Sequence, residues 1–201
     1  QLARNNFGKA MKIMQQIGNM AGEAATWHNL ASIDLRMGDY YSARNNFEKS
    51  MKIKQQIGDR SGEAATWNQL ATIDLKMKNL DLARKKFETA MKIYQQIGDK
   101  AGEAVTWHNL AAVDLEMGIY AEAREKFETS LKIKQLVGDK AGEAATWYQL
   151  ARTDLNKKDY EGALEKFETS MKIKKQIGDI TGEAAILHQM AEIYFLQGRY
   201  N

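Results

Sequence analysis

The chain has 201 residues, of which 44% are hydrophobic, enough for a folded core, and it contains no cysteine. The absence of cysteine excludes disulfides, cysteine metal sites and thiol catalysis, and it fits a reducing, cytoplasmic setting. The 29 basic and 26 acidic residues are interspersed, so the net charge of +3 does not arise from a basic nucleic-acid-binding tail. No apolar run reaches the roughly 18 residues of a membrane span.

The sequence repeats itself with a period of 40 residues. The words that mark each copy are GEAATW at 22–27 and 62–67, GEAVTW at 102–107, GEAATW at 142–147 and GEAAIL at 182–187. Glycine and phenylalanine recur at the same interval, in the columns Gly18, Gly58, Gly98, Gly138, Gly178 and Phe7, Phe47, Phe87, Phe127, Phe167. A fixed period of this length indicates stacked structural repeats.

Each repeat is predicted to be an antiparallel helix hairpin. Residues 1–18 have the pattern of the second half of a repeat, so we expect the chain to be a fragment of a longer array. In the next repeat, apolar residues recur at helical spacing from Ala24 to Ile33 and again from Ala43 to Ile57. The chain closes with the first helix of the fifth repeat.

The connections carry helix-capping residues. Gly58 is predicted to end one helix in the left-handed conformation, and Asp59 to cap the next. The other connection uses Gly38, which Lys78 and Lys158 replace in later repeats. With no proline and no flexible linker, residues 1–201 are predicted to form a single domain of ten helices.

The pattern resembles the tetratricopeptide repeat, on the residues Trp67, Leu70, Ala71, Ala83 and Phe87 of the second repeat. This resemblance implies an all-α, right-handed superhelical solenoid of five hairpins, starting with a second helix and ending with a first helix. The period of 40 exceeds the family's usual period of about 34 residues. In this respect the chain is similar to the repeats of kinesin light chains, polarity scaffolds and bacterial peptide sensors.

An aspartate column and an arginine column vary together. The fifth repeat has Tyr194 in place of the aspartate and Leu164 in place of the arginine. Pairing each arginine with the aspartate 30 residues later matches charge with charge and leaves Leu164 beside Tyr194, so no buried carboxylate lacks a partner. We therefore predict the inter-repeat salt bridges Arg4–Asp34, Arg44–Asp74, Arg84–Asp114 and Arg124–Asp154.

Nothing in the sequence indicates catalysis. The motifs of phosphate loops, dinucleotide folds, zinc proteases and serine hydrolases are absent. His28, His108 and His188 fall in alternate repeats, too far apart to share one metal ion. We predict no catalytic residue, no metal site and no cofactor.

The resemblance implies a concave groove lined by the first helices. In that family the positions one, two and five after the tryptophan face the groove, and here they are mostly polar. Each Asn or Gln offers a donor and an acceptor to the backbone of an extended peptide. The predicted peptide-binding residues are His28, Asn29, Ser32, Asn68, Gln69, Thr72, His108, Asn109, Tyr148, Gln149, Arg152, His188 and Gln189.

The preferred function is therefore a non-catalytic interaction module with a protein or peptide partner. One alternative is that the polar columns are only a solvated face. Another is a spacer or sensor arm of a larger signalling protein. We disfavour nucleic-acid or anionic-surface binding by an outer lysine stripe, which would comprise Lys12, Lys52, Lys92, Lys132 and Lys172 with Lys54, Lys134 and Lys174.

The fifth repeat is unusually apolar, through Ile186, Leu187, Tyr194 and Phe195. Its first helix is expected either to end the stack or to receive a further helix. Neither end of the sequence has the polar capping element of a solenoid, so head-to-tail self-association is a further expectation.

Overall fold

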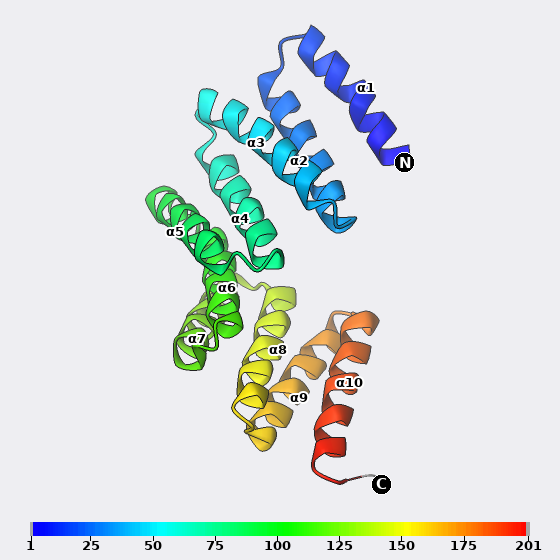
Figure 1. The fold of residues 1–201 in the computed structure, drawn as a ribbon, viewed down its shortest axis with the longest axis vertical. Helices are drawn as coiled ribbons and strands as arrows, with labels where there is room; N and C mark the ends of the chain where they lie inside the picture. The colour runs from blue at the N-terminus through cyan, green and yellow to red at the C-terminus, as the bar shows by residue number, and fades with distance from the viewer. Residues whose placement is uncertain (1, 200–201) are drawn as a thin grey trace. The chain divides into compact units, whose positions relative to one another are not determined.

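The computed structural model describes residues 2–199, and these residues form ten helices and no strand. The helices follow one another along the chain in the order shown in Figure 1. Their bounds are α1 Leu2–Gln16, α2 Met20–Arg36, α3 Tyr40–Gln56, α4 Arg60–Lys76, α5 Leu80–Ile97, α6 Lys100–Glu116, α7 Tyr120–Val137, α8 Lys140–Asn156, α9 Tyr160–Gln176 and α10 Ile180–Leu196. Among the described residues, no helix is both long enough and apolar enough to cross a membrane.

The chain divides into two compact units, residues 1–102 and residues 103–201. In unit 1, α2 pairs most extensively with α3 and α4 with α5, and in unit 2, α8 pairs with α9. The even-numbered helices are therefore the first helices of the predicted hairpins and the odd-numbered helices are the second. That the whole chain acts as one domain remains a prediction.

The connections form as the capping pattern predicts. Asp59 Oδ1 accepts a hydrogen bond of 2.9 Å from the backbone N–H of Gly62, and Gly58 adopts a φ of 73°. Lys78 and Lys158 adopt φ of 62°, so the turn keeps the left-handed conformation where lysine replaces glycine.

The fully buried phenylalanines of α3, α5, α7 and α9 are at the centre of the core. Phe47 is fully buried with Ala31 and Ala43 of its own hairpin and with Leu70 and Ile73 of the next first helix. In unit 2 the same pattern recurs with Phe167 packed among Ala151, Ala163, Ile186 and Ile193. The helices α3 and α9 are thus each held between two successive first helices.

Residues of the GEAATW motif connect a first helix to the second helix that precedes it. A Cβ added to Gly62 would lie 2.9 Å from Lys54 Cδ and 2.0 Å from Asp59 Oδ2, so only glycine fits this contact. The glutamate accepts a hydrogen bond from a glutamine on the preceding helix, as in Gln55 to Glu63 at 3.1 Å. The tryptophan packs between repeats, since Trp67 contacts both the Phe47 core and the side chains of α5.

Buried aspartates pair with arginines at the offset of 30 residues. Arg44 Nη2 lies 2.7 Å from Asp74 Oδ1, and Arg4 and Arg124 pair in the same way with Asp34 and Asp154. Each of these pairs joins a second helix to the first helix that follows it. The pair Arg84–Asp114 would link the two units, and it remains a prediction.

The aspartates also have a second partner, which lies 12 residues later on the following second helix. In unit 2, Lys126 Nζ is 2.5 Å from Asp114 Oδ2 and Lys166 Nζ is 2.7 Å from Asp154 Oδ2. In unit 1, Lys86 pairs with Asp74, and the amide of Asn46 donates to Asp34 Oδ2 at 2.8 Å. One carboxylate therefore connects the helices on either side of it.

These contacts explain the ionisation of the buried Asp74 carboxyl. Burial alone would raise the pKa of Asp74, but the hydrogen bonds from Arg44 and Lys86 outweigh it and hold this pKa below its ordinary value. Because the folded-state pKa is depressed, the stabilisation from this group is present above the unfolded pKa of 3.8 and is lost at more acid pH.

We expect Arg124→Leu to destabilise the chain by about 2–3 kcal/mol, because it leaves the fully buried Asp154 carboxylate with only Lys166. The double variant Arg124→Leu, Asp154→Tyr should lose less, since it reproduces the Leu164 and Tyr194 combination of the fifth repeat. Denaturant unfolding measures both losses, with the exposed Lys132→Leu as the control. Equal losses in the single and double variants would contradict the pairing.

Candidate functional site

Two small hollows lie against the first helices, one in each unit. The hollow in unit 1 has a volume of about 250 Å³ and is lined by Ala21, Ala24, Ala25, His28, Asn29, Lys54, Ile57 and Asp59. The hollow in unit 2 has a volume of about 220 Å³ and is lined by His108, Ala145, Tyr148, Gln149, Lys174, Gly182, Ala185 and Ile186. Four repeat positions are common to both linings, namely Ala25/Ala145, His28/Tyr148, Asn29/Gln149 and Lys54/Lys174.

The first predicted groove column supplies His28 to the hollow in unit 1 and both His108 and Tyr148 to the hollow in unit 2. The ring of His28 packs edge-on against Phe47, with centroids 5.0 Å apart, and Tyr148 packs in the same way on Phe167 at 5.3 Å. His108 also packs on a phenylalanine, with its ring centroid 5.1 Å from that of Phe127. The hydrophobic core therefore fixes the orientation of these rings, and they remain half-buried at the surface of the hollows.

Two members of this column differ from the others. Asn68 is buried and hydrogen-bonds to Tyr94 of α5. The side chain of His188 is 73% exposed, and its Nε2 lies 3.4 Å from Glu192 Oε1.

The carboxamide column lies beside these rings. Asn29 is exposed, and Gln69, Asn109, Gln149 and Gln189 are half-buried. The structure places Asn29 and Gln149 at the two hollows. Gln189 donates to Glu192 Oε2 at 2.9 Å within its own helix.

The third predicted column is bonded within its own helix. Ser32 Oγ donates to the carbonyl of His28, and Thr72 Oγ1 donates to the carbonyl of Asn68, both at 2.9 Å. Arg152 donates to the side-chain oxygen of Gln149 at 3.2 Å. None of these three side chains lines either hollow.

The sequence analysis misplaced one lysine column. Lys54 and Lys134 were assigned to an outer stripe, but their exposed fractions are only 7% and 4%. Each stem passes against a glycine of the next first helix, as in the contact of Lys54 with Gly62. A lysine on an amphipathic helix looks solvated in sequence, whereas its long stem can be buried while the ammonium group reaches polar atoms.

The buried ammonium groups are held by backbone and hydroxyl oxygens. Lys54 Nζ donates to the Gly62 carbonyl at 3.2 Å and to Thr66 Oγ1 at 3.0 Å, and it lies 3.3 Å from His28 Nδ1. Lys134 makes the equivalent contacts with Gly142 and Thr146, at 3.3 and 2.9 Å. Lys174 differs, because its Nζ lies 2.5 Å from Asp179 Oδ2.

Burial shifts the ionisation of these groups. Burial and the neighbouring Lys54 charge lower the pKa of His28 to about 4, and burial and Lys134 lower the pKa of His108 to about 3. Both rings are therefore uncharged near neutral pH and are able to donate and accept hydrogen bonds. Burial also lowers the pKa of Lys134 to about 8, against an opposing effect of Asp139.

A correlation between the lysine column and the ring column could have predicted which lysines are buried. The residue 26 positions before each lysine is a ring, with His28 before Lys54, His108 before Lys134 and Tyr148 before Lys174. Where the lysine is replaced by Tyr94, the ring is replaced by Asn68, which bonds to it. Within residues 2–199, no three His, Cys, Asp or Glu side chains are close enough to hold a metal ion.

The family model described as "Tetratricopeptide repeat" matches residues 22–96 and 62–136 of the chain. The search of curated proteins found no match.

Solved structures with the same fold have low sequence identity. BtubC (BKLC) from P. vanneervenii is 15% identical, with a TM-score of 0.73, over 98% of this chain and 92% of that one. The putative kinesin light chain repeats of Podosopora anserina are 19% identical, with a TM-score of 0.67, over 88% of this chain and 87% of that one.

A third structure is the Rap conjugation gene regulator of plasmid pLS20 in complex with the Phr* peptide. It is 13% identical, with a TM-score of 0.78, over 90% of this chain, which spans only 50% of the regulator. At these identities the likeness shows the fold alone.

We expect Lys134 to add about 2 kcal/mol to the stability of the chain between pH 8 and pH 10. Its folded-state pKa of about 8 lies below the unfolded value of 10.5, so the unfolded chain binds more protons in this window. Denaturant unfolding of the wild type and of Lys134→Met across this range gives the difference.

The exposed Lys132→Met is the matched control and should keep the wild-type slope. Tyr94 and the other titrating groups are common to all three chains, so their contributions cancel in the comparison. The assignment fails if Lys134→Met shows the same pH dependence as the wild type.

Proposed function

We propose that this chain, which belongs to the tetratricopeptide repeat family, is a non-catalytic interaction module that binds an extended segment or a helix of a partner protein along its first helices. The observation that carries this proposal is the recurrence of one hollow, with the same four lining positions, in both units. A polypeptide presents the same backbone groups at regular intervals. A surface that repeats its polar groups suits such a ligand.

The lining offers complementary groups for a peptide. The carboxamides of Asn29 and Gln149 present both donors and acceptors, which is what a peptide amide requires. Lys54 and Lys174 also line these hollows, Lys54 together with Asp59 and Lys174 paired with Asp179. Ala25 and Ala145 keep the wall low, so a backbone can approach closely.

The rings that line the hollows, His28 in unit 1 and His108 and Tyr148 in unit 2, are pre-positioned. The core phenylalanine on which each ring packs restricts its movement, so less side-chain freedom is lost when a ligand binds. His28 and Tyr148 differ in size and hydrogen bonding, which gives each hollow its own side-chain preference. Selectivity would then come from the ring column and affinity from the carboxamide column.

The Rap regulator supports this reading in a limited way, because it is a protein of this fold whose structure contains a peptide. The present chain spans only half of that regulator, so the regulator's function in gene control is not transferred to this chain. A sensor arm in a cytoplasmic signalling protein is compatible with peptide binding.

Nucleic-acid binding has less support from the structure than from the sequence. The exposed lysine column has one member in each repeat, Lys12, Lys52, Lys92, Lys132 and Lys172. Lys54 and Lys134 do not add to it, because they are buried against the next first helix. Exposed acidic side chains such as Glu48 and Glu88 are interspersed with the remaining lysine column.

The proposal is tested by peptide-display selection against the wild type and against a variant in which Asn29, Gln69, Asn109 and Gln149 are alanine. We expect the wild type to enrich a defined motif. The variant should bind a peptide of that motif more than about tenfold more weakly, since each lost hydrogen bond costs about 1 kcal/mol.

The matched control changes four exposed glutamines of the second helices, Gln16, Gln56, Gln96 and Gln176, to alanine and should bind like the wild type. Circular dichroism checks that both variants are folded. Equal weakening in both variants, or no enrichment by the wild type, would contradict the groove and favour a spacer role. Enrichment of acidic ligands that is lost with salt and unaffected by the groove variant would favour the lysine column.

A further inference from the structure

Lys54 is a buried amine at the edge of a hollow. Only 7% of this residue is exposed, yet it lines the hollow of about 250 Å³ in unit 1. The lining also includes the small apolar side chains of Ala21, Ala24 and Ala25, which leave room beside the lysine. A small ligand in the hollow can therefore come next to the Lys54 side chain.

The partners of the Lys54 ammonium group are neutral. Its Nζ donates to the Gly62 carbonyl at 3.2 Å and to Thr66 Oγ1 at 3.0 Å, and it lies 3.3 Å from His28 Nδ1. Burial and the lysine charge lower the pKa of His28 to about 4, so this ring is uncharged near pH 7. Burial lowers the pKa of Lys54 as well, and the charge of Asp59 opposes this effect. The folded structure thus increases the fraction of uncharged, nucleophilic amine at this position.

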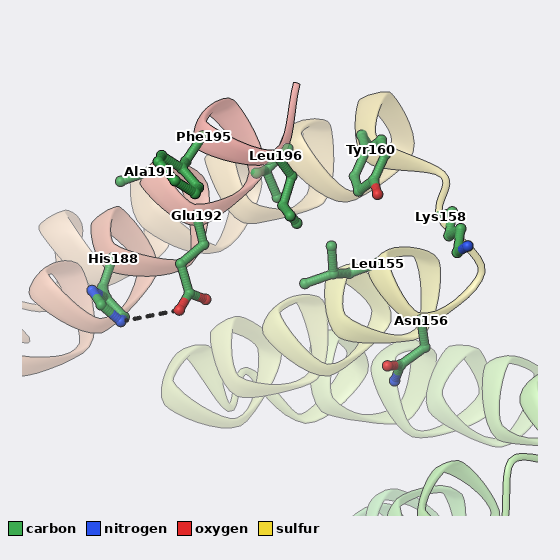
Figure 2. A pocket seen from close by; sticks show the side chains of 10 residues that line it. Leu155, Asn156, Lys158, Tyr160, His188, Ala191, Glu192, Phe195 and Leu196 are labelled. Carbon is green, nitrogen blue, oxygen red and sulfur yellow. Dashed lines mark ion pairs between the residues drawn. The ribbon is translucent and has the colours of Figure 1, made fainter. Parts of the chain in front are cut away.

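Three other lysines each lack one of these features. Lys174 lines the hollow in unit 2 at the same repeat position, but its Nζ lies 2.5 Å from Asp179 Oδ2, which stabilises its charge. Lys134 is buried like Lys54 but lines neither hollow. Figure 2 shows a larger cavity of about 790 Å³ beside α10, where Lys158 is exposed to water. Lys54 combines a cavity, burial and neutral partners.

We propose that Lys54 is a covalent attachment site for a small aliphatic aldehyde that enters the hollow in unit 1. After the ammonium group loses one proton to water, the Nζ lone pair bonds to the carbonyl carbon. The carbonyl oxygen then leaves as water with the two remaining amine protons, and an imine is formed without oxidation or reduction.

The rest of the hollow suits this reaction. The carboxamide of Asn29 lines the same hollow and can donate a hydrogen bond to the carbonyl oxygen during the attack. The alanine wall favours an apolar chain on the aldehyde. This site goes beyond the peptide-binding proposal and does not depend on it, although an adduct would occupy part of the same surface.

The test is reductive labelling of the whole chain at pH 7 with butanal and sodium cyanoborohydride, whose hydride converts each imine to a stable secondary amine. Mass spectrometry of peptides gives the labelling rate at each lysine. We expect Lys54 to be labelled severalfold faster than Lys52, an exposed lysine of the same helix. This advantage should shrink at higher pH, because exposed lysines then also lose their protons.

Asp179→Asn tests the role of the ion pair. Asparagine keeps the oxygen that accepts from the Gly182 N–H at the start of α10, but it removes the charge beside Lys174. We expect the labelling of Lys174 to rise severalfold in this variant, while Lys54 keeps its wild-type rate. Asp159→Asn, which alters the equivalent cap of α9, is the matched control and should change neither rate.

Two results would overturn the proposal. One is a Lys54 that is labelled no faster than Lys52 at pH 7, since labelling would then follow exposure alone. The other is a Lys174 whose labelling rate is the same in Asp179→Asn as in the wild type, since the charge of the partner would then not control the reactivity of a lysine at this repeat position.

Discussion

The buried aspartates of the first helices α2, α4, α6 and α8 are the constraint on which the packing of the repeats depends. A carboxylate away from water is costly unless positive partners surround it, and here the partners come from two different helices. Asp74 is held by Arg44 of the helix before it and by Lys86 of the helix after it. If either neighbouring helix were displaced by one turn, the carboxylate would lose one of its two positive partners. The arrangement therefore fixes the register of three helices at once, which apolar packing alone does much less sharply.

This constraint has a consequence for the inner surface. Because charge pairs and the packing of the phenylalanines and rings fix the helices, the carboxamides beside them are not needed to hold the repeats together. Residues such as Asn29 and Gln149 are therefore available for the proposed binding of a partner. The buried lysines belong to both roles, since Lys54 bonds to the carbonyl of Gly62 and also lines a hollow.

Much of the fold could be predicted because the sequence presents each feature several times. The capping of Asp59 and the left-handed turns follow from local chemistry, and the offset between Arg44 and Asp74 follows from one compensating exception at Leu164 and Tyr194. The inward course of Lys54 and the second partner Lys86 were missed. The course of Lys54 depends on the close approach of two helices beside Gly62, and the contact of Lys86 depends on how the following second helix packs on Asp74, and no periodicity of the lysines shows either. The candidate site was therefore predicted only for its ring and carboxamide positions.

The near identity of the repeats also bears on how the chain finds its native order. Every second helix carries almost the same surface, so many non-native pairings between distant repeats would satisfy the same contacts. The departures distinguish the positions. Tyr94 bonds to Asn68, Asn46 replaces a lysine beside Asp34, and Leu164 replaces an arginine, so these interfaces do not exchange freely with the others. These differences between repeats favour the native helix pairings over non-native pairings of nearly identical helices, and so reduce misfolding.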